Sequence, residues 1–156
     1  MYRKIVVPLD GSKLAECALG HVEAIAKGCN TLEVDLVRVV RPIPLYMSGD
    51  DMSYIDPSVL TKAVEGEKAQ AKVYLDKLVK DLGAKNISAK SVVLSGEPAQ
   101  SVIDYAEKNG AELIVMSSHG RSGPARWAMG SVAERVTQHA KLPVLVVAAP
   151  GCRIKV

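Results

Sequence analysis

Two glycine-containing turns carry the residues best suited to bind a ligand. Gly120 follows the apolar run Leu113–Ser117, and nine residues separate it from Gly130-Ser131, which precedes a helical pattern. Backbone N–H groups in such turns and at a helix start attract anions, and above all phosphates. A phosphate oxygen must come within about 3 Å of these amides, and a Cβ atom would block that approach. The stretch is a candidate phosphate site, although a turn glycine and an ordinary helix cap give the same pattern.

Several polar side chains accompany these glycines. Arg121 and Arg126 lie between them and can pair with phosphate oxygens, and His119 can contact a phosphate or a sugar. Asp10, after the first apolar run, can bind a ribose hydroxyl, an adenine amine or a metal on phosphates. The competing interpretation is that Asp10 forms an Asx turn and that Ser12 caps the next helix. The arginines and His119 can equally be solvated or turn residues.

Short apolar runs alternate with helical patterns along the whole chain. Buried strands are expected at 4–9, 32–40, 87–94, 113–117 and 143–147, and helices from Ser12 to about Asn30 and over 57–82, 99–109 and 132–140. Gly83 is expected just beyond the second of these helices. This alternation predicts an α/β fold: one domain with an open five-stranded parallel sheet and helices on both faces, Rossmann-like in type.

The predicted sheet brings the candidate residues together. Ligands of such sheets bind outside the carboxyl ends of the strands, at the topological switch point. Asp10 ends the first strand and Ser117 ends the fourth, so adjacent strands would place both in one crevice. Val39 and Met116 belong either to the core or to the wall of an adenine pocket. The connection Arg41–Asp56 is long enough to be functional.

Length and composition exclude several classes of protein. With 156 residues the chain is long enough to bury roughly 70% of its unfolded surface, and we expect a domain over 1–150 and a tail over 151–156. A net charge of +3 without a basic block argues against a nucleic-acid partner. The first apolar run is too short for a signal peptide or a membrane span. Three unclustered cysteines favour a reducing compartment, so a cytoplasmic location is expected.

Familiar catalytic motifs are missing. The sequence has neither G-x-G-x-x-G after the first strand nor G-x-x-x-x-G-K-[ST], which disfavours the nicotinamide Rossmann and P-loop classes. Ser122 lies in G-R-S-G and lacks the spacing of a nucleophile elbow. A phospho-receiver domain would need an Asp and a Lys where Leu94-Ser95 and Ala148-Ala149 stand. No residue is an evident general base aimed at a phosphate, so any hydrolysis is expected to be slow.

Taken together, these segments resemble the universal stress protein family, of the UspA-like type. The resemblance rests on IVVPLDGS, VRVV, SGEP and VMSSHGRSGPARWAMGSVAERV followed by LPVLVV, and it extends from Lys4 to Val147. The ATP-binding branch of the family carries Gly, two residues, Gly, nine residues, Gly, then Ser or Thr. Gly120, Gly130 and Ser131 match this spacing, whereas Ser117 replaces the first glycine.

The resemblance implies a set of contacts and a mode of action. It implies a fold like that of the adenine nucleotide alpha hydrolases, with ATP or another adenine nucleotide bound and Mg²⁺ or Mn²⁺ held mainly by its phosphates. It also implies a homodimer paired through the strand around Leu142–Val147. The implied contacts are Pro8, Asp10 and Val39 to adenine, Met116 and Ser117 to ribose, and Gly120, Arg121, Gly130, Ser131 and Val132 to phosphates, with Ser12 and His119 nearby.

Three functions remain open at the level of the sequence. The first is an ATP-binding stress-response switch that acts through nucleotide-dependent conformation, with slow or no hydrolysis. The second is a dimeric interaction module of the same fold that binds no nucleotide, which the substitution at Ser117 keeps possible. The third is a true enzyme, a slow ATPase or an adenylyl-transfer enzyme, for which no catalytic residues are evident.

Overall fold

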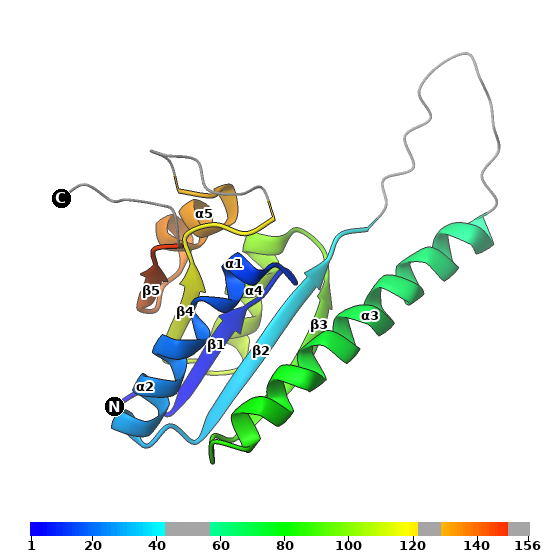
Figure 1. Cartoon of the computed structure of the whole chain (residues 1–156). Coiled ribbons are helices and arrows are strands. Elements are labelled where there is room, and N and C mark those ends of the chain that lie inside the picture. The colour runs from blue at the N-terminus through cyan, green and yellow to red at the C-terminus, as the bar shows by residue number, and fades with distance from the viewer. Residues whose placement is uncertain (43–56, 122–128, 150–156) are drawn as a thin grey trace.

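The computed structural model describes residues 1–42, 57–121 and 129–149 (Figure 1). Most of the connection predicted over 41–56, residue Arg126 and the predicted tail over 151–156 lie outside the described residues. In the described ranges, no helix is both long and apolar enough to cross a bilayer.

Five parallel strands form one sheet, as the alternating pattern predicted. Its order is β3-β2-β1-β4-β5, so β1 lies in the middle and pairs with β2 on one side and β4 on the other. The chain therefore changes direction across the sheet between β1 and β4, which makes their carboxyl ends the switch point. The strands are β1 Lys4–Pro8, β2 Glu33–Val40, β3 Ala89–Ser95, β4 Leu113–Ser117 and β5 Val144–Val147.

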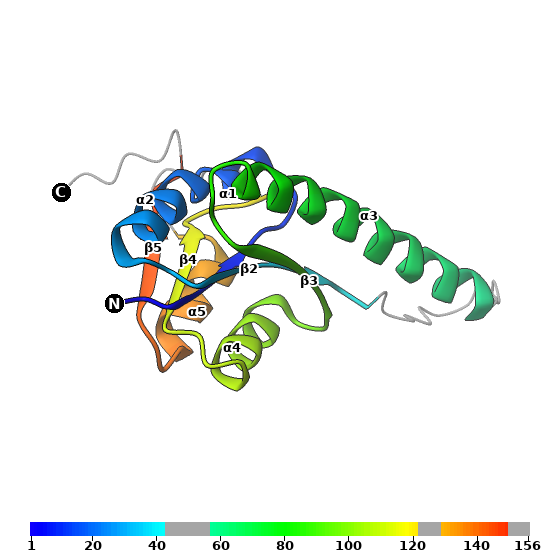
Figure 2. The same cartoon turned by 90° about the horizontal axis from the view of Figure 1, so that it is seen from below.

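Helices cover both faces of the sheet (Figure 2). Side chains alternate along a strand, so in β1 Ile5 and Val7 enter one core and Val6 enters the other. The first core is closed by α1, α2 and α3, and the second by α4 and α5. The helices are α1 Lys13–Glu16, α2 Leu19–Cys29, α3 Pro57–Gly83, α4 Pro98–Lys108 and α5 Ser131–His139.

Two boundary predictions were wrong. The first helix is interrupted, because the backbone N–H groups of Cys17 and Ala18 bond three residues back, to Leu14 and Ala15, and tighten the chain before α2 begins. Gly83 lies inside α3 rather than beyond it, and the left-handed turn residue that follows is Asn86, with φ of 61°. The predicted Ser12 cap is confirmed, since its hydroxyl accepts the Ala15 N–H at 3.1 Å.

Helix α3 is longer than the sheet that it covers. Its buried residues are Ala71, Leu75, Leu78 and Leu82, all in the second half. From Ser58 to Gln70 every side chain is exposed or partly exposed. This first half extends past the carboxyl ends of β2 and β3 (Figure 1).

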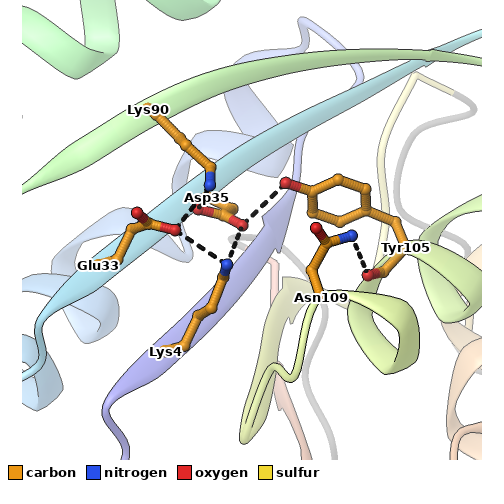
Figure 3. Close-up of polar contacts among 6 residues, drawn as sticks. All are labelled: Lys4, Glu33, Asp35, Lys90, Tyr105 and Asn109. Carbon is orange, nitrogen blue, oxygen red and sulfur yellow. Dashed lines mark hydrogen bonds and ion pairs between the residues drawn. The ribbon is translucent and has the colours of Figure 1, made fainter.

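A charged network ties α4 to the amino-terminal end of the sheet (Figure 3). Asp35 of β2 has no exposed surface, and its Oδ2 accepts the Tyr105 hydroxyl at 2.9 Å. Lys4 and Lys90, from the two flanking strands, lie 3.4 Å and 3.5 Å from its carboxylate oxygens. Both ammonium groups also contact Oε1 of Glu33, at 2.9 Å and 2.7 Å. Three strands and one helix are thereby linked through a single buried charge.

The electrostatics of this network follow from burial and pairing. Burial raises the pKa of Asp35, and the same effect, with the hydrogen bond to Asp35, raises the pKa of Tyr105 to about 12. Hydrogen bonds from Lys90 and then Lys4 lower the pKa of Glu33 to about 2. Within the described part of the chain, Oδ1 of Asp35 has no hydrogen-bond partner. Asp35 therefore depends on the two lysines for compensation of its charge.

Candidate functional site

Strands β1 and β4 are adjacent in the sheet, so the loops at their carboxyl ends meet. Asp10 follows β1 and contacts the loop after β4, because its Oδ2 accepts the Arg121 backbone N–H at 2.7 Å. Its Oδ1 accepts the Ser12 N–H at 2.9 Å, which is the Asx turn offered by the competing interpretation. Burial acts to raise the pKa of Asp10, but hydrogen bonds from Ser12 and Arg121 outweigh it and lower the pKa. Asp10 is thus an ionised carboxylate whose hydrogen bonds connect the loop after β1 to the loop after β4.

The loop after β4 is held from three sides. Ser118 donates its backbone N–H to Val147 of β5 at 2.8 Å, and its hydroxyl accepts the Ala149 N–H at 3.0 Å. Its carbonyl accepts the Gly130 N–H at 2.8 Å, which joins the loop to the start of α5. His119 is buried, with Nδ1 3.0 Å from the Ser118 hydroxyl. The hydrogen bond between Gly130 and Ser118 therefore brings the two glycine turns singled out in the sequence together, beyond the ends of β4 and β5.

Both glycines lie where an added Cβ atom would meet a neighbouring loop. A Cβ atom on Gly120 would overlap Oδ2 of Asp10 and stand 2.9 Å from its Cγ. A Cβ atom on Gly130 would stand 3.0 Å from the Ser118 carbonyl oxygen. Neither glycine has a positive φ, so the constraint is the approach of neighbouring loops rather than backbone conformation.

Helix α5 begins without a capping side chain, because its N-cap is Gly130. The first N–H groups of an α-helix have no partner within the helix, so among the described residues those of Ser131 and Val132 are available to a ligand or to solvent. They also carry the positive end of the helix dipole.

Ser117, the residue in place of the expected glycine, is buried beneath this loop. Its hydroxyl lies 3.4 Å from the Cys17 thiol, which donates to it, and 3.4 Å from the His119 backbone N–H. The Cβ of Ser117 therefore sits between the α1–α2 junction and the loop after β4. Of the other predicted contacts, Met116 is buried in the core under α4 and α5, whereas Val39 and Pro8 are partly exposed at strand ends.

A cavity of about 480 Å³ opens beside this loop cluster. It lies between the N-termini of α4 and α5, at the carboxyl ends of β2 and β3. Among the residues predicted for the site, Ser131 and Val132 line it. The remaining lining residues are Arg41, Pro42, Gly96, Glu97, Pro98 and Arg135.

Sequence reasoning missed the charged residues of the cavity. Glu97 lies in S-G-E-P, a segment used for the family resemblance but not for the site, and it is the N-cap of α4. Arg135 lies one turn into α5, and Arg41 follows β2. The feature that they share is position, since each lies within a few residues of a strand end or a helix start at the carboxyl edge of the sheet.

The described residues hold no cluster of three or more His, Cys, Asp or Glu side chains that could bind a metal ion.

Comparison with known proteins identifies this arrangement. The sequence model of the universal stress protein family matches residues 1–148. The chain belongs to the universal stress protein family. It is 39% identical to universal stress protein MJ0531 of Methanocaldococcus jannaschii over 150 residues, which is 96% of this chain and 84% of that protein. The family accounts for the order of strands and helices.

Solved structures of universal stress proteins share the fold. The structure of MJ0577, from the same archaeon, superposes with a TM-score of 0.80 at 29% identity and covers 97% of this chain and 99% of its own. More distant members include one solved in complex with cAMP, with a TM-score of 0.61 at 22% identity over 95% of this chain and 98% of its own. Another, from Arabidopsis thaliana, was solved with AMP bound, with a TM-score of 0.64 at 14% identity over 95% and 92%. At these identities the likeness shows the fold of this universal stress protein.

Proposed function

We propose that this universal stress protein binds ATP, or another adenine nucleotide, and acts as a nucleotide-dependent switch with slow or no hydrolysis. The observation that carries the proposal is the joining of the two turns, Gly120 and Gly130-Ser131, in one hydrogen-bonded cluster at the start of an uncapped helix. The nine-residue spacing is that of the ATP-binding branch. Two relatives solved with cAMP and AMP add support for an adenine ligand.

The donors around the cavity suit a phosphate group. The N-terminus of α5 offers backbone N–H groups, and Arg41 and Arg135 offer positive charge. In this proposal, adenine lies toward Pro8, Asp10 and Val39, and ribose toward Met116 and Ser117. The phosphates lie along Gly120, Arg121, Gly130, Ser131 and Val132. Mg²⁺ or Mn²⁺ would be carried by the phosphates, because Asp10 already accepts two backbone N–H groups.

We also propose that β5 pairs with β5 of a second copy. It lies at the edge of the sheet, bonded to β4 on one side, and Val144, Leu145 and Val146 are partly exposed. An apolar edge strand is prone to aggregation, and pairing with an identical strand covers it.

Gly130→Val tests the phosphate site. The branched side chain would press on the Ser118 carbonyl and cover the first amides of α5, so we expect ATP affinity to fall at least tenfold. The measurement is calorimetric titration with ATP and Mg²⁺, with circular dichroism to check the fold and mass spectrometry of nucleotide released from the denatured wild-type protein. Wild-type protein that carries no nucleotide and does not bind millimolar ATP would favour the interaction module and refute the switch.

Ser117→Gly tests the departure from the expected motif. Removal of the Cβ and hydroxyl frees space beneath the loop, at the cost of the contacts with Cys17 and His119. We expect ATP to bind several-fold more tightly and the free energy of unfolding to fall by about 1 kcal/mol. Titration and urea denaturation of the same sample separate the two effects. Unchanged affinity would mean that Ser117 does not limit the approach of the ligand.

A further inference from the structure

The cavity contains an ion pair between the two helices that form its walls. Nη1 of Arg135, from α5, lies 3.3 Å from Oε1 of Glu97, at the start of α4. Arg41 also faces Glu97 closely enough to contribute to the lowering of its pKa. The cavity therefore holds two positive groups and one carboxylate, which leaves a net positive charge for an anionic ligand.

The two oxygens of Glu97 have separate roles. Oε2 accepts the Gln100 backbone N–H at 2.8 Å and thereby caps α4, whereas Oε1 carries the contact with Arg135. The capping hydrogen bond from Gln100 is the main reason that the pKa of Glu97 is lowered, and the arginines contribute less. Glu97 would therefore keep its place and its charge if Arg135 moved away.

The contact with Arg135 is easy to exchange. The side chains of Arg135 and Glu97 are 62% and 45% exposed, and ion pairs at such sites contribute little to stability. An arginine that leaves one carboxylate for a phosphate exchanges one charge-assisted contact for a stronger, bidentate one. The position of the pair at the mouth of the cavity makes this exchange possible without movement of either helix.

The position of the guanidinium determines which phosphate Arg135 can reach. Arg135 lies four residues beyond Ser131 on the same face of α5, but its guanidinium contacts Glu97, at the start of α4, on the other wall of the cavity. A chain of several phosphates that begins at the first amides of α5 can extend across the cavity toward this guanidinium. A single phosphate held at those amides leaves the pair of Arg135 and Glu97 in place.

We propose that Arg135 is a ligand for the outer phosphates of the nucleotide. Glu97 holds the Arg135 side chain in place until the nucleotide arrives. This pair makes the site prefer nucleotides with several phosphates to nucleoside monophosphates. The inference rests on the proposed nucleotide site and names its ligand class more narrowly. Glu97 acts as the internal counter-ion, and its negative charge weakens the binding of every phosphate chain to some degree.

Arg135→Gln and Glu97→Gln test the exchange in opposite directions. We expect Arg135→Gln to weaken ATP binding about tenfold and AMP binding less than twofold. Glu97→Gln keeps a side-chain oxygen that can cap α4 but removes the competing charge, so ATP should bind several-fold more tightly and AMP nearly as before. The measurement is calorimetric titration of the full chain with ATP and with AMP, at low and high salt.

Two matched controls are available outside the cavity, one on α4 and one just before β1. Glu107→Gln removes a similar exposed pair, with Lys141 at 3.7 Å, from the far end of α4, and Arg3→Gln removes an exposed arginine that lies 3.9 Å from Glu112. Neither control variant should change the ratio of the affinity for ATP to the affinity for AMP. Equal weakening of ATP and AMP by Arg135→Gln, or no change in either, would overturn the inference and leave nucleotide binding intact. Failure of wild-type protein to bind ATP and AMP would overturn both proposals.

Discussion

Gly120→Ala is expected to destabilise the protein by about 1.5–3 kcal/mol and to weaken ATP binding at least tenfold. The new methyl group would overlap the Asp10 carboxylate, which must then release the Arg121 N–H that it now accepts at 2.7 Å. A lost hydrogen bond to an ionised group leaves both partners poorly satisfied at a partly buried position. The loop after β4 would also move away from the start of α5. Urea denaturation and ATP titration measure the two effects.

A matched substitution and a double-mutant cycle make this result specific. Gly66→Ala changes the same atoms in the exposed part of α3, where nothing lies within 4 Å of the new Cβ, and should leave stability unchanged or raised by up to about 1 kcal/mol. In an Asp10→Ala background, Gly120→Ala should cost much less than in the wild type, because the clash is removed. Equal costs in the two backgrounds would show that the contact with Asp10 is not the cause.

The double variant Lys4→Met, Lys90→Met should lower the free energy of unfolding at pH 7 by about 3–5 kcal/mol. Asp35 has no exposed surface, and the two lysines are its compensating charges (Figure 3). Methionine retains much of the length and apolar stem of lysine, so the main change is the loss of positive charge. One hydrogen bond, from Tyr105, would then remain to offset the burial of a carboxylate.

The stability of the double variant should depend on pH, and the pKa of Asp35 determines the direction of that dependence. Burial already raises the pKa of Asp35 above its unfolded value, and loss of the lysines raises that pKa further. The folded double variant therefore takes up a proton before the unfolded chain does, and its stability should rise as the pH falls from 7 toward the ordinary range of an Asp. Each pH unit between the pKa of Asp35 in the folded variant and its pKa in the unfolded chain restores about 1.4 kcal/mol to the free energy of unfolding.

The wild type should respond differently to acid. The lysines lower the pKa of Glu33 to about 2, so its contribution is present above pH 4.5 and is lost as the pH falls toward 2. Urea denaturation should show that the free energy of unfolding of the double variant rises between pH 7 and pH 5. The wild type should show no rise of similar size. Addition of Asp35→Asn should restore much of the lost stability at pH 7 and abolish the rise. A double variant that is as stable as the wild type at pH 7 would contradict this account of Asp35.

The sheet could be predicted because its signal is local. Each strand is an apolar run bounded by Gly, Pro or polar residues, and parallel strands buried on both faces leave that pattern. The meeting of Asp10 with the loop after β4 followed from the strand order alone. The break between α1 and α2 could not be predicted, since Leu14, Ala18 and Val22 continue one helical face across it.

The cavity and the charged network escaped prediction for the same physical reason. Arg41, Glu97 and Arg135 come from three elements, and each is an ordinary solvated residue in its own segment. Asp35 is a carboxylate with apolar residues on both sides in β2, but its partners lie on β1, β3 and α4. Pairing across elements depends on register, which a single sequence does not reveal.

The uneven burial of α3 divides that helix into two regions of different thermodynamic character. The half from Ala71 onward can open only when the core of the molecule opens, because Leu75 and Leu82 are sealed in it. The half before it loses little apolar contact on opening, and a free helix of that length is marginal in water. One continuous helix therefore spans a steep gradient of local unfolding free energy, from nearly nothing at its start to the global value at its end.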